Sequence, residues 1–247
     1  MAKYTMKQIL ESYTPEKRNN TSFWARIFSR PLSYLITYLM INMGLSANAV
    51  SVMSIFVALA ACVLIMMGNP ISTIGVFLFL FWNVMDCVDG NIARVKHTAS
   101  LKGDFFDAVS GYTAAAFIYL SVGVAAFREP GLLSGLGFWI IIIGATASLS
   151  DLLSRIIYQK FLVTQLKLTK DDGTGGDIES ERKSGLKRIA DKITRNMTYS
   201  SLFMPLLVIS KFTHSFDILT VFYCIYSVLI LIGTYVMFME KASKEFN

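Results

Sequence analysis

Charged residues, histidine, cysteine and proline are all scarce in this sequence. Only 16% of the 247 residues are charged, whereas 54% are hydrophobic, and there are two histidines, three cysteines and five prolines. The cysteines are odd in number and lie in apolar segments, which argues against a disulfide framework and indicates small packing residues. Apolar runs close to the length that crosses a bilayer recur instead, so the chain is predicted to be an integral membrane protein.

Positive charge is in excess but is not gathered into one patch. The formal charge is +6, and the basic residues lie between the apolar runs. Loops on the cytosolic side of a membrane protein have this pattern, so no nucleic-acid partner is expected. No cleavable signal peptide is expected either, because residues 1–20 are polar and lack an apolar core.

Six membrane-spanning helices are predicted from the apolar runs. A shorter apolar stretch, residues 32–43, is too short for a span, so it is predicted to be an interfacial amphipathic helix. The competing interpretation, a seventh short span, would put the basic N-terminus and the basic loops on opposite sides. The six predicted spans cover about residues 48–67, 71–94, 101–127, 136–162, 197–212 and 216–239.

These segments predict an all-α integral membrane protein. Residues 1–46 would form a cytosolic segment with the interfacial helix, and residues 47–247 a six-helix membrane catalytic domain with a cytosolic loop at 164–195. Alternate connections carry most of the Lys and Arg residues, so both termini are predicted to face the cytoplasm. We therefore expect a multi-pass protein of the cell membrane whose acidic residues, described next, face the cytoplasm.

Three aspartates stand where the second and third predicted spans face each other. Asp86 and Asp89 lie near the end of one span and Asp107 near the start of the next. Residues three and four positions apart share a helix face, so two antiparallel helices can direct these aspartates into one cavity. Ionised carboxylates in a membrane are costly unless they are paired or bind a metal. Clustered carboxylate oxygens suit Mg²⁺ or Mn²⁺.

Small residues and one arginine accompany the aspartates. Gly90, Ala93 and Gly103 let a ligand approach the backbone closely, and Arg94 is placed to neutralise a phosphate. Carboxylates, a metal and an arginine at a membrane boundary are what phosphoryl-type transfer from a nucleotide-linked substrate needs. The alternative interpretations are helix–helix ion pairs and the ion path of a transporter.

The spacing of these residues resembles the signature of the CDP-alcohol phosphotransferases. The matching motif is Asp86-x2-Asp89-Gly90-x2-Ala93-Arg94-x8-Gly103-x3-Asp107. The resemblance extends over about residues 30–240 and implies the six-helix fold, homodimers and a reaction in which an alcohol or polyol acceptor attacks the β-phosphorus of a CDP-alcohol and CMP leaves. It also implies that the three aspartates bind one or two divalent metal ions and that the small residues and the arginine line the CDP site.

The resemblance breaks at Gly111, where the family signature has a further aspartate, usually assigned as the general base. A placed base contributes roughly 10²–10⁴-fold in rate. Asp107 stays a catalytic candidate, and Asp104, on the same helix face, is the nearest replacement. Asp104 is alternatively a solvated residue favoured by the helix dipole. The chain would be an enzyme with another base, an altered or inactivated enzyme, or a protein that binds CDP without turnover.

Further candidates lie outside the motif. The resemblance implies that Arg155 and Arg195 can bind an anionic group of the acceptor, a task that the forked guanidinium group suits. The alternatives are that Arg155 pairs with Asp151 and that Arg195 is a positive-inside anchor. Asn48, at the start of the first span, is a candidate nucleotide contact, with helix capping as the alternative. The sequence thus predicts a metal-dependent transferase of phospholipid or related glycolipid synthesis. A CDP-binding pseudoenzyme and an ion or small-solute transporter are the alternatives.

Overall fold

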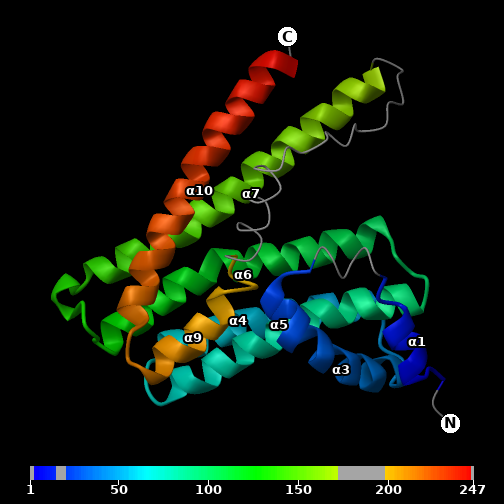
Figure 1. Ribbon diagram of the computed structural model, residues 1–247, viewed down its shortest axis with the longest axis horizontal. Coiled ribbons are helices and arrows are strands. Elements are labelled where there is room, and N and C mark those ends of the chain that lie inside the picture. The colour runs from blue at the N-terminus through cyan, green and yellow to red at the C-terminus, as the bar shows by residue number, and fades with distance from the viewer. Residues whose placement is uncertain (1–2, 15–20, 172–197, 246–247) are drawn as a thin grey trace.

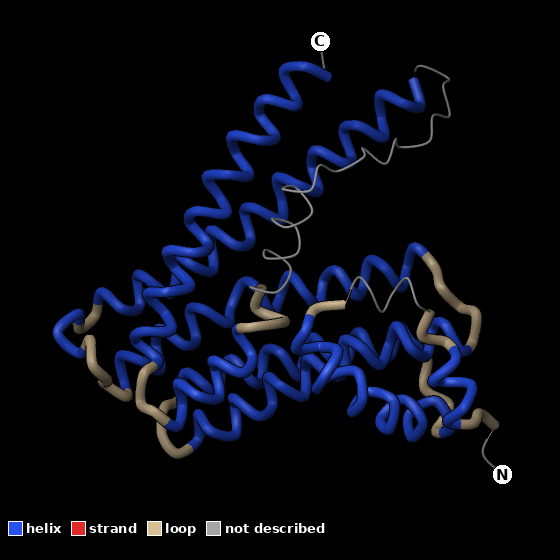
Figure 2. Tube along the Cα trace, in the orientation of Figure 1, coloured by secondary structure: helices blue, strands red, loops and turns tan. Residues whose placement is uncertain are grey.

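The computed structural model describes residues 3–14, 21–171 and 198–245. Over these ranges the chain is built of helices and short connections, without a strand (Figure 2). An all-helical chain satisfies its backbone hydrogen bonds within each segment, which a bilayer requires of any spanning structure. The all-α prediction is therefore confirmed for the part of the chain that the structure describes.

Five helices of the described chain are long and apolar enough to cross a membrane. A helix rises about 1.5 Å per residue, so roughly 20 residues cover a hydrocarbon core of about 30 Å. This confirms several membrane-crossing helices, as expected of a multi-pass membrane protein. The five are α4 (Ala47–Met66), α5 (Ile71–Val95), α6 (Leu101–Arg128), α7 (Trp139–Asp171) and α10 (Phe216–Glu245).

A sixth span is not confirmed. Its place is taken by α9 (Phe203–Phe212), which has 10 residues and so covers about 15 Å, roughly half of the hydrocarbon core. The C-terminal end of α9 nevertheless lies at the end of the bundle where the predicted span 197–212 would end. Residues 67–69, 128–130 and His214 line one pocket, so the chain after α9 is at the same end of the bundle as the turns after α4 and α6.

The N-terminal region forms three short segments. They are α1 (Met6–Glu11), which the sequence did not indicate, a π-helical turn η1 (Ala25–Ser29) and α3 (Arg30–Asn42). Helix α3 corresponds to the predicted interfacial helix and carries Pro31 in its first turn, where the missing N–H costs nothing. Ser33, Thr37 and Ile41 are buried and recur every four residues, so this face of α3 packs on α5. Its position at a membrane surface stays a prediction.

The predicted loop at 164–195 begins later than expected. Helix α7 continues through Asp171, and residues 172–197 lie outside the described residues. The start of α7 is also later than predicted, because a 3₁₀ turn, η2 (Ser134–Leu136), precedes it. The division into residues 1–46 and 47–247 stays a prediction.

Helices α7 and α10 pack against each other and rise away from the remaining helices (Figures 1 and 2). They join the bundle through α6, and two glycines set the spacing between α6 and α7. A Cβ on Gly123 would lie 2.9 Å from the carbonyl oxygen of Ile140, and one on Gly144 would lie 2.7 Å from that of Tyr119. Small residues let membrane helices approach this closely. The aromatic core formed by Tyr119, Phe203 and Tyr223 lies close by.

Candidate functional site

The acidic residues face one another because of how α4, α5 and α6 pack. Helix α4 packs against both α5 and α6, whereas α5 and α6 contact each other little. The turn between them ends at Ser100, whose hydroxyl accepts a hydrogen bond from the N–H of Gly103 at 3.2 Å and so begins α6. The end of α5 and the start of α6 thus share one end of the bundle, hereafter the acidic end.

The structure brings Asp86 and Asp107 into contact, with Asp89 nearby on α5. The carboxyl groups of Asp86 and Asp107 share a hydrogen bond across the two helices. Asp89, one turn further along α5, is 5% exposed. Its Oδ2 accepts from the hydroxyl of Ser51 on α4 at 2.6 Å, and its Oδ1 accepts from the N–H of Gly90 at 2.5 Å. Asp107 is exposed and Asp86 half-buried, so the pair is open to solvent.

These residues fit a divalent cation. Two carboxyl groups in contact repel each other when both are ionised, so a proton or a cation must lie between them. Within the described residues no three His, Cys, Asp or Glu side chains are close enough to form a complete ligand set. Mg²⁺ usually keeps several waters and binds through one or two carboxylates and the phosphates of its substrate. The contact between Asp86 and Asp107 provides the protein's share of such a site.

The remaining motif residues lie around these carboxylates. A Cβ on Gly103 would lie 3.2 Å from Oδ1 of Asn48, so the start of α4 faces the start of α6 at the predicted nucleotide contact. A Cβ on Gly90 would lie 3.2 Å from Nη1 of Arg94, so that side chain folds back along α5. Ala93 is half-buried. Asp104 is exposed in the first turn of α6, where the helix dipole favours an acidic residue, and its role as a base stays a prediction.

Two guanidinium groups converge beside the aspartates. Arg30 Nη1 donates to Oδ1 of Asn91 at 3.3 Å, and Arg94 Nη2 donates to the same oxygen at 2.6 Å. The amide nitrogen of Asn91 donates to the hydroxyls of Ser33 and Thr37 on α3, at 3.0 and 3.1 Å. The Nε atoms of both arginines are buried and have no hydrogen-bond partner among the residues that the structure describes. Two cations on one neutral amide form a site suited to an anion.

Of the two arginines predicted to bind the acceptor, the structure describes only Arg155. Arg155 forms a two-pronged ion pair with Asp151, at 2.9 and 3.4 Å, as its alternative interpretation stated. Its guanidinium also lies 4.8 Å from the ring centre of Tyr199. That tyrosine donates its hydroxyl to the carbonyl oxygen of Gly111 at 3.0 Å. Arg195 lies outside the described residues.

Sequence reasoning missed three residues of this site: Arg30, Asn91 and Tyr199. Asn91 offered a signal, because a polar residue inside an apolar span calls for a partner. Arg30 offered a weaker one, since it lies at the start of a short amphipathic helix. Tyr199 offered none, because its partner Gly111 is 88 residues away in the sequence.

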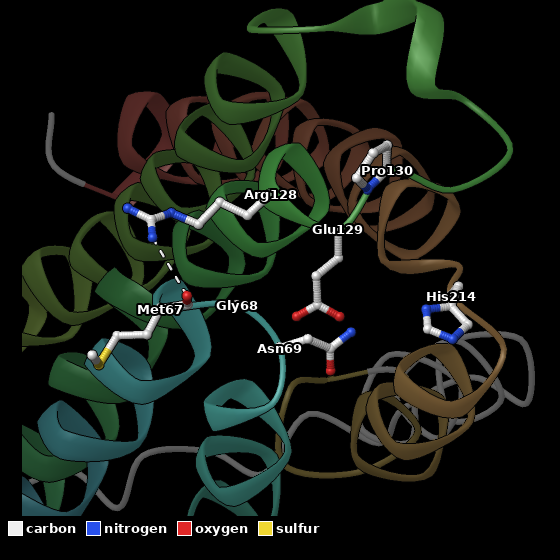
Figure 3. Close-up of a pocket in the computed structure, with 7 residues that line it drawn as sticks. All are labelled: Met67, Gly68, Asn69, Arg128, Glu129, Pro130 and His214. Atoms are coloured by element: carbon white, nitrogen blue, oxygen red, sulfur yellow. Dashed lines mark hydrogen bonds between the residues drawn. The ribbon is translucent and has the colours of Figure 1, made fainter.

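A polar pocket of about 430 Å³ lies at the opposite end of the bundle (Figure 3). There Lys211 and Glu129 form a buried ion pair at 2.7 Å. The hydroxyl of Ser72 accepts from Lys211 at 2.6 Å and donates to Glu129 at 2.5 Å. Lys211 also donates to Asn69. These charges satisfy one another and join the turns that follow α4, α6 and α9, so we interpret the cluster as structural.

A comparison with protein families supports the same region of the chain. The sequence profile described as CDP-alcohol phosphatidyltransferase matches residues 44–239. That range contains the whole motif and includes all or most of each of the five long helices. A comparison with curated proteins finds no match to the chain.

Proposed function

The chain belongs to the CDP-alcohol phosphatidyltransferase family, and we propose that it is an active, metal-dependent member. The family transfers phosphatidyl groups from CDP-alcohols to alcohol acceptors. The proposed reaction moves a substituted phosphate group from a CDP-alcohol, such as CDP-diacylglycerol, to a hydroxyl acceptor and releases CMP. The product would be a phospholipid or a related membrane glycolipid, made at the cytoplasmic face of the cell membrane.

One observation carries this proposal: a carboxyl pair and a guanidinium pair lie side by side at the end of α5. The Asp86–Asp107 contact suits a cation, and the Arg30–Arg94 pair suits an anion. A nucleoside diphosphate bound to a divalent cation satisfies both at once. Ion pairing within the protein alone would not leave the buried Nε atoms of two arginines without partners among the described residues.

The residues can be given roles on this basis. Mg²⁺ or Mn²⁺ held by Asp86 and Asp107, with Asp89 oriented by Ser51, would supply Lewis-acid polarisation of the phosphoryl oxygens. Arg94 and Arg30 hold the diphosphate, and Gly90 and Gly103 leave room for the nucleotide to approach the backbone. Ala93 and Asn48 line the same space.

The acceptor side needs a place for one proton. The acceptor oxygen forms a bond to the β-phosphorus, the bond from that phosphorus to the leaving CMP breaks, and the hydroxyl proton departs. Asp107 is exposed to solvent at the open side of the site and takes this proton, with Asp104 one turn away as the second candidate. Arg155 and Arg195 would bind an anionic group of the acceptor. The homodimer stays a prediction.

The direct test is CMP release from CDP-diacylglycerol by the purified protein with polyol acceptors and Mg²⁺. We expect a chelator to abolish release and added Mg²⁺ or Mn²⁺ to restore it, and Asp86→Asn to remove it without lowering the melting temperature. Release that is unaffected by chelation would contradict the metal role.

A CDP-binding protein without turnover is the second candidate, and the glycine at position 111 is the observation that favours it. It predicts that CDP raises the melting temperature while no CMP is released with any acceptor. CMP release by the unaltered chain rejects it.

A further inference from the structure

A tyrosine hydroxyl lies where the side chain of residue 111 would begin. Gly111 is on α6, one turn after Asp107, and its carbonyl oxygen accepts from the hydroxyl of Tyr199 at 3.0 Å. A Cβ added to Gly111 would lie 3.2 Å from the same hydroxyl oxygen. The space next to the glycine is therefore occupied by a polar atom from the segment that leads into α9.

The tyrosine ring is held by two neighbouring side chains. Tyr199 is 5% exposed. The ring of Trp82 stacks on it with the ring centres 5.8 Å apart, and the guanidinium of Arg155 lies 4.8 Å from its centre. Trp82 is itself anchored to Ser110 at 3.1 Å, and Arg155 to Asp151. A buried ring with a cation and an indole against it has little freedom, so its hydroxyl occupies a defined position.

The electrostatic surroundings keep this hydroxyl neutral. Burial raises the pKa of Tyr199 above its ordinary value, and the nearby carboxylates of Asp86, Asp151 and Asp107 raise it further, while Arg155 opposes them. Tyr199 thus lies within the electrostatic reach of the motif's aspartates. A neutral phenol is not a base at neutral pH, but it is both a donor and an acceptor of hydrogen bonds.

We propose that the hydroxyl of Tyr199 positions the acceptor alcohol in place of the carboxylate that the family signature has at position 111. This inference rests on the proposed function. The hydrogen of Tyr199 is directed at the Gly111 carbonyl, so the lone pairs of its oxygen remain available. The acceptor hydroxyl donates to this oxygen and turns its own lone pair toward the β-phosphorus. As the new P–O bond forms and CMP leaves, the acceptor's proton passes to solvent at the open side of the site, and Tyr199 stays protonated.

The test compares two tyrosine-to-phenylalanine variants. Tyr199→Phe keeps the stacked ring and removes only the hydroxyl. Tyr119→Phe is the matched control, because the buried hydroxyl of Tyr119 has no hydrogen-bond partner among the described residues. CMP release is measured from CDP-diacylglycerol with glycerol, inositol and glycerol 3-phosphate as acceptors. Tyr199→Phe should lower kcat by about tenfold, the size of one positioning hydrogen bond. It should leave the affinity for CDP unchanged, and Tyr119→Phe should change neither.

A second pair of variants separates positioning from structure. Gly111→Asp supplies the carboxylate. In that background Tyr199→Phe should lower kcat by less than about twofold, because the new carboxylate and the tyrosine hydroxyl both position the acceptor alcohol. An equal loss in both backgrounds, or no loss in either, overturns the inference. So does CDP binding by the unaltered chain without any CMP release, which leaves the nucleotide site standing. Absence of both CDP binding and CMP release overturns the proposed function itself.

Discussion

At the scale of single residues, Asn91 does what few side chains can. Its amide nitrogen donates to two hydroxyls on α3 while its oxygen accepts from two guanidinium groups. An aspartate in its place would offer no donors, and a leucine would leave two like charges with nothing between them. Asn91 therefore holds Arg30 and Arg94 close together although their positive charges repel each other. An anion bound between the two guanidinium groups would reduce that repulsion.

Arg30→Met should weaken CDP binding about tenfold, because one charge-assisted hydrogen bond to a phosphate is lost. The affinity for cytidine, which has no phosphate, should not change. Binding is measured as the ligand-dependent rise in melting temperature or by calorimetry. Arg128→Met is the control, since Arg128 lies at the opposite end beside the polar pocket of Figure 3. Equal losses for CDP and cytidine would show that Arg30 acts on the fold and not on the diphosphate.

At the scale of helices, the positions of small residues decide which helices pack against each other. Helices α6 and α7 meet at Gly123 and Gly144, where the backbones lie nearly in contact. Hydrophobic burial gives little preference among helices that are surrounded by lipid, so packing of small residues determines the partner. This contact fixes the base from which α7 and α10 extend, and α7 carries Arg155 to the ring of Tyr199.

Two glycine-to-alanine changes should have opposite effects. Gly144→Ala places a Cβ 2.7 Å from the Tyr119 carbonyl oxygen, and forcing the helices apart should cost about 1–3 kcal/mol. Gly233→Ala, in α10, meets nothing within 4 Å, so it should be neutral or stabilise the helix by about 0.5–1 kcal/mol. Melting temperatures in detergent measure both. A Gly144→Ala protein as stable as the unaltered chain would contradict the close contact.

At the scale of the whole molecule, the two ends of the bundle have different chemistry. The acidic end carries the aspartates, the two arginines and Tyr199. The opposite end carries the Lys211–Glu129 pair, which joins the turns after α4, α6 and α9. Helix α9 reaches that end although it covers only half of a bilayer. The chain therefore leaves that end through α10 (Figure 1).

Cysteine labelling tests this orientation. In intact cells, a membrane-impermeant maleimide should label Ser134→Cys, in η2, but should label Ser243→Cys, near the end of α10, only after permeabilisation. Both serines are exposed, and the native cysteines are buried or half-buried, so the unaltered chain is the background control. Labelling of both variants from the same side would contradict the predicted topology.

Much of the fold could be predicted because it depends on local properties. The starts of α5 and α6, at residues 71 and 101, agree with the predicted spans. The end of α7 was missed because polar residues continue a helix as readily as they form a loop. The predicted span at 197–212 could not be judged from hydropathy alone, because residues 203–209 are apolar yet belong to a helix of only 10 residues.

The sequence by itself determined the membrane class, the family motif and which face of α5 carries Asp86, Asp89 and Gly90. These follow from run length and from three- and four-residue spacing within one helix. Only the tertiary structure decided that Arg30 joins Arg94, and that a tyrosine hydroxyl lies beside Gly111. The hydrogen bonds from Arg30 to Asn91 and from Tyr199 to Gly111 join residues 61 and 88 positions apart, and a separation of that size leaves no periodic pattern in a single sequence.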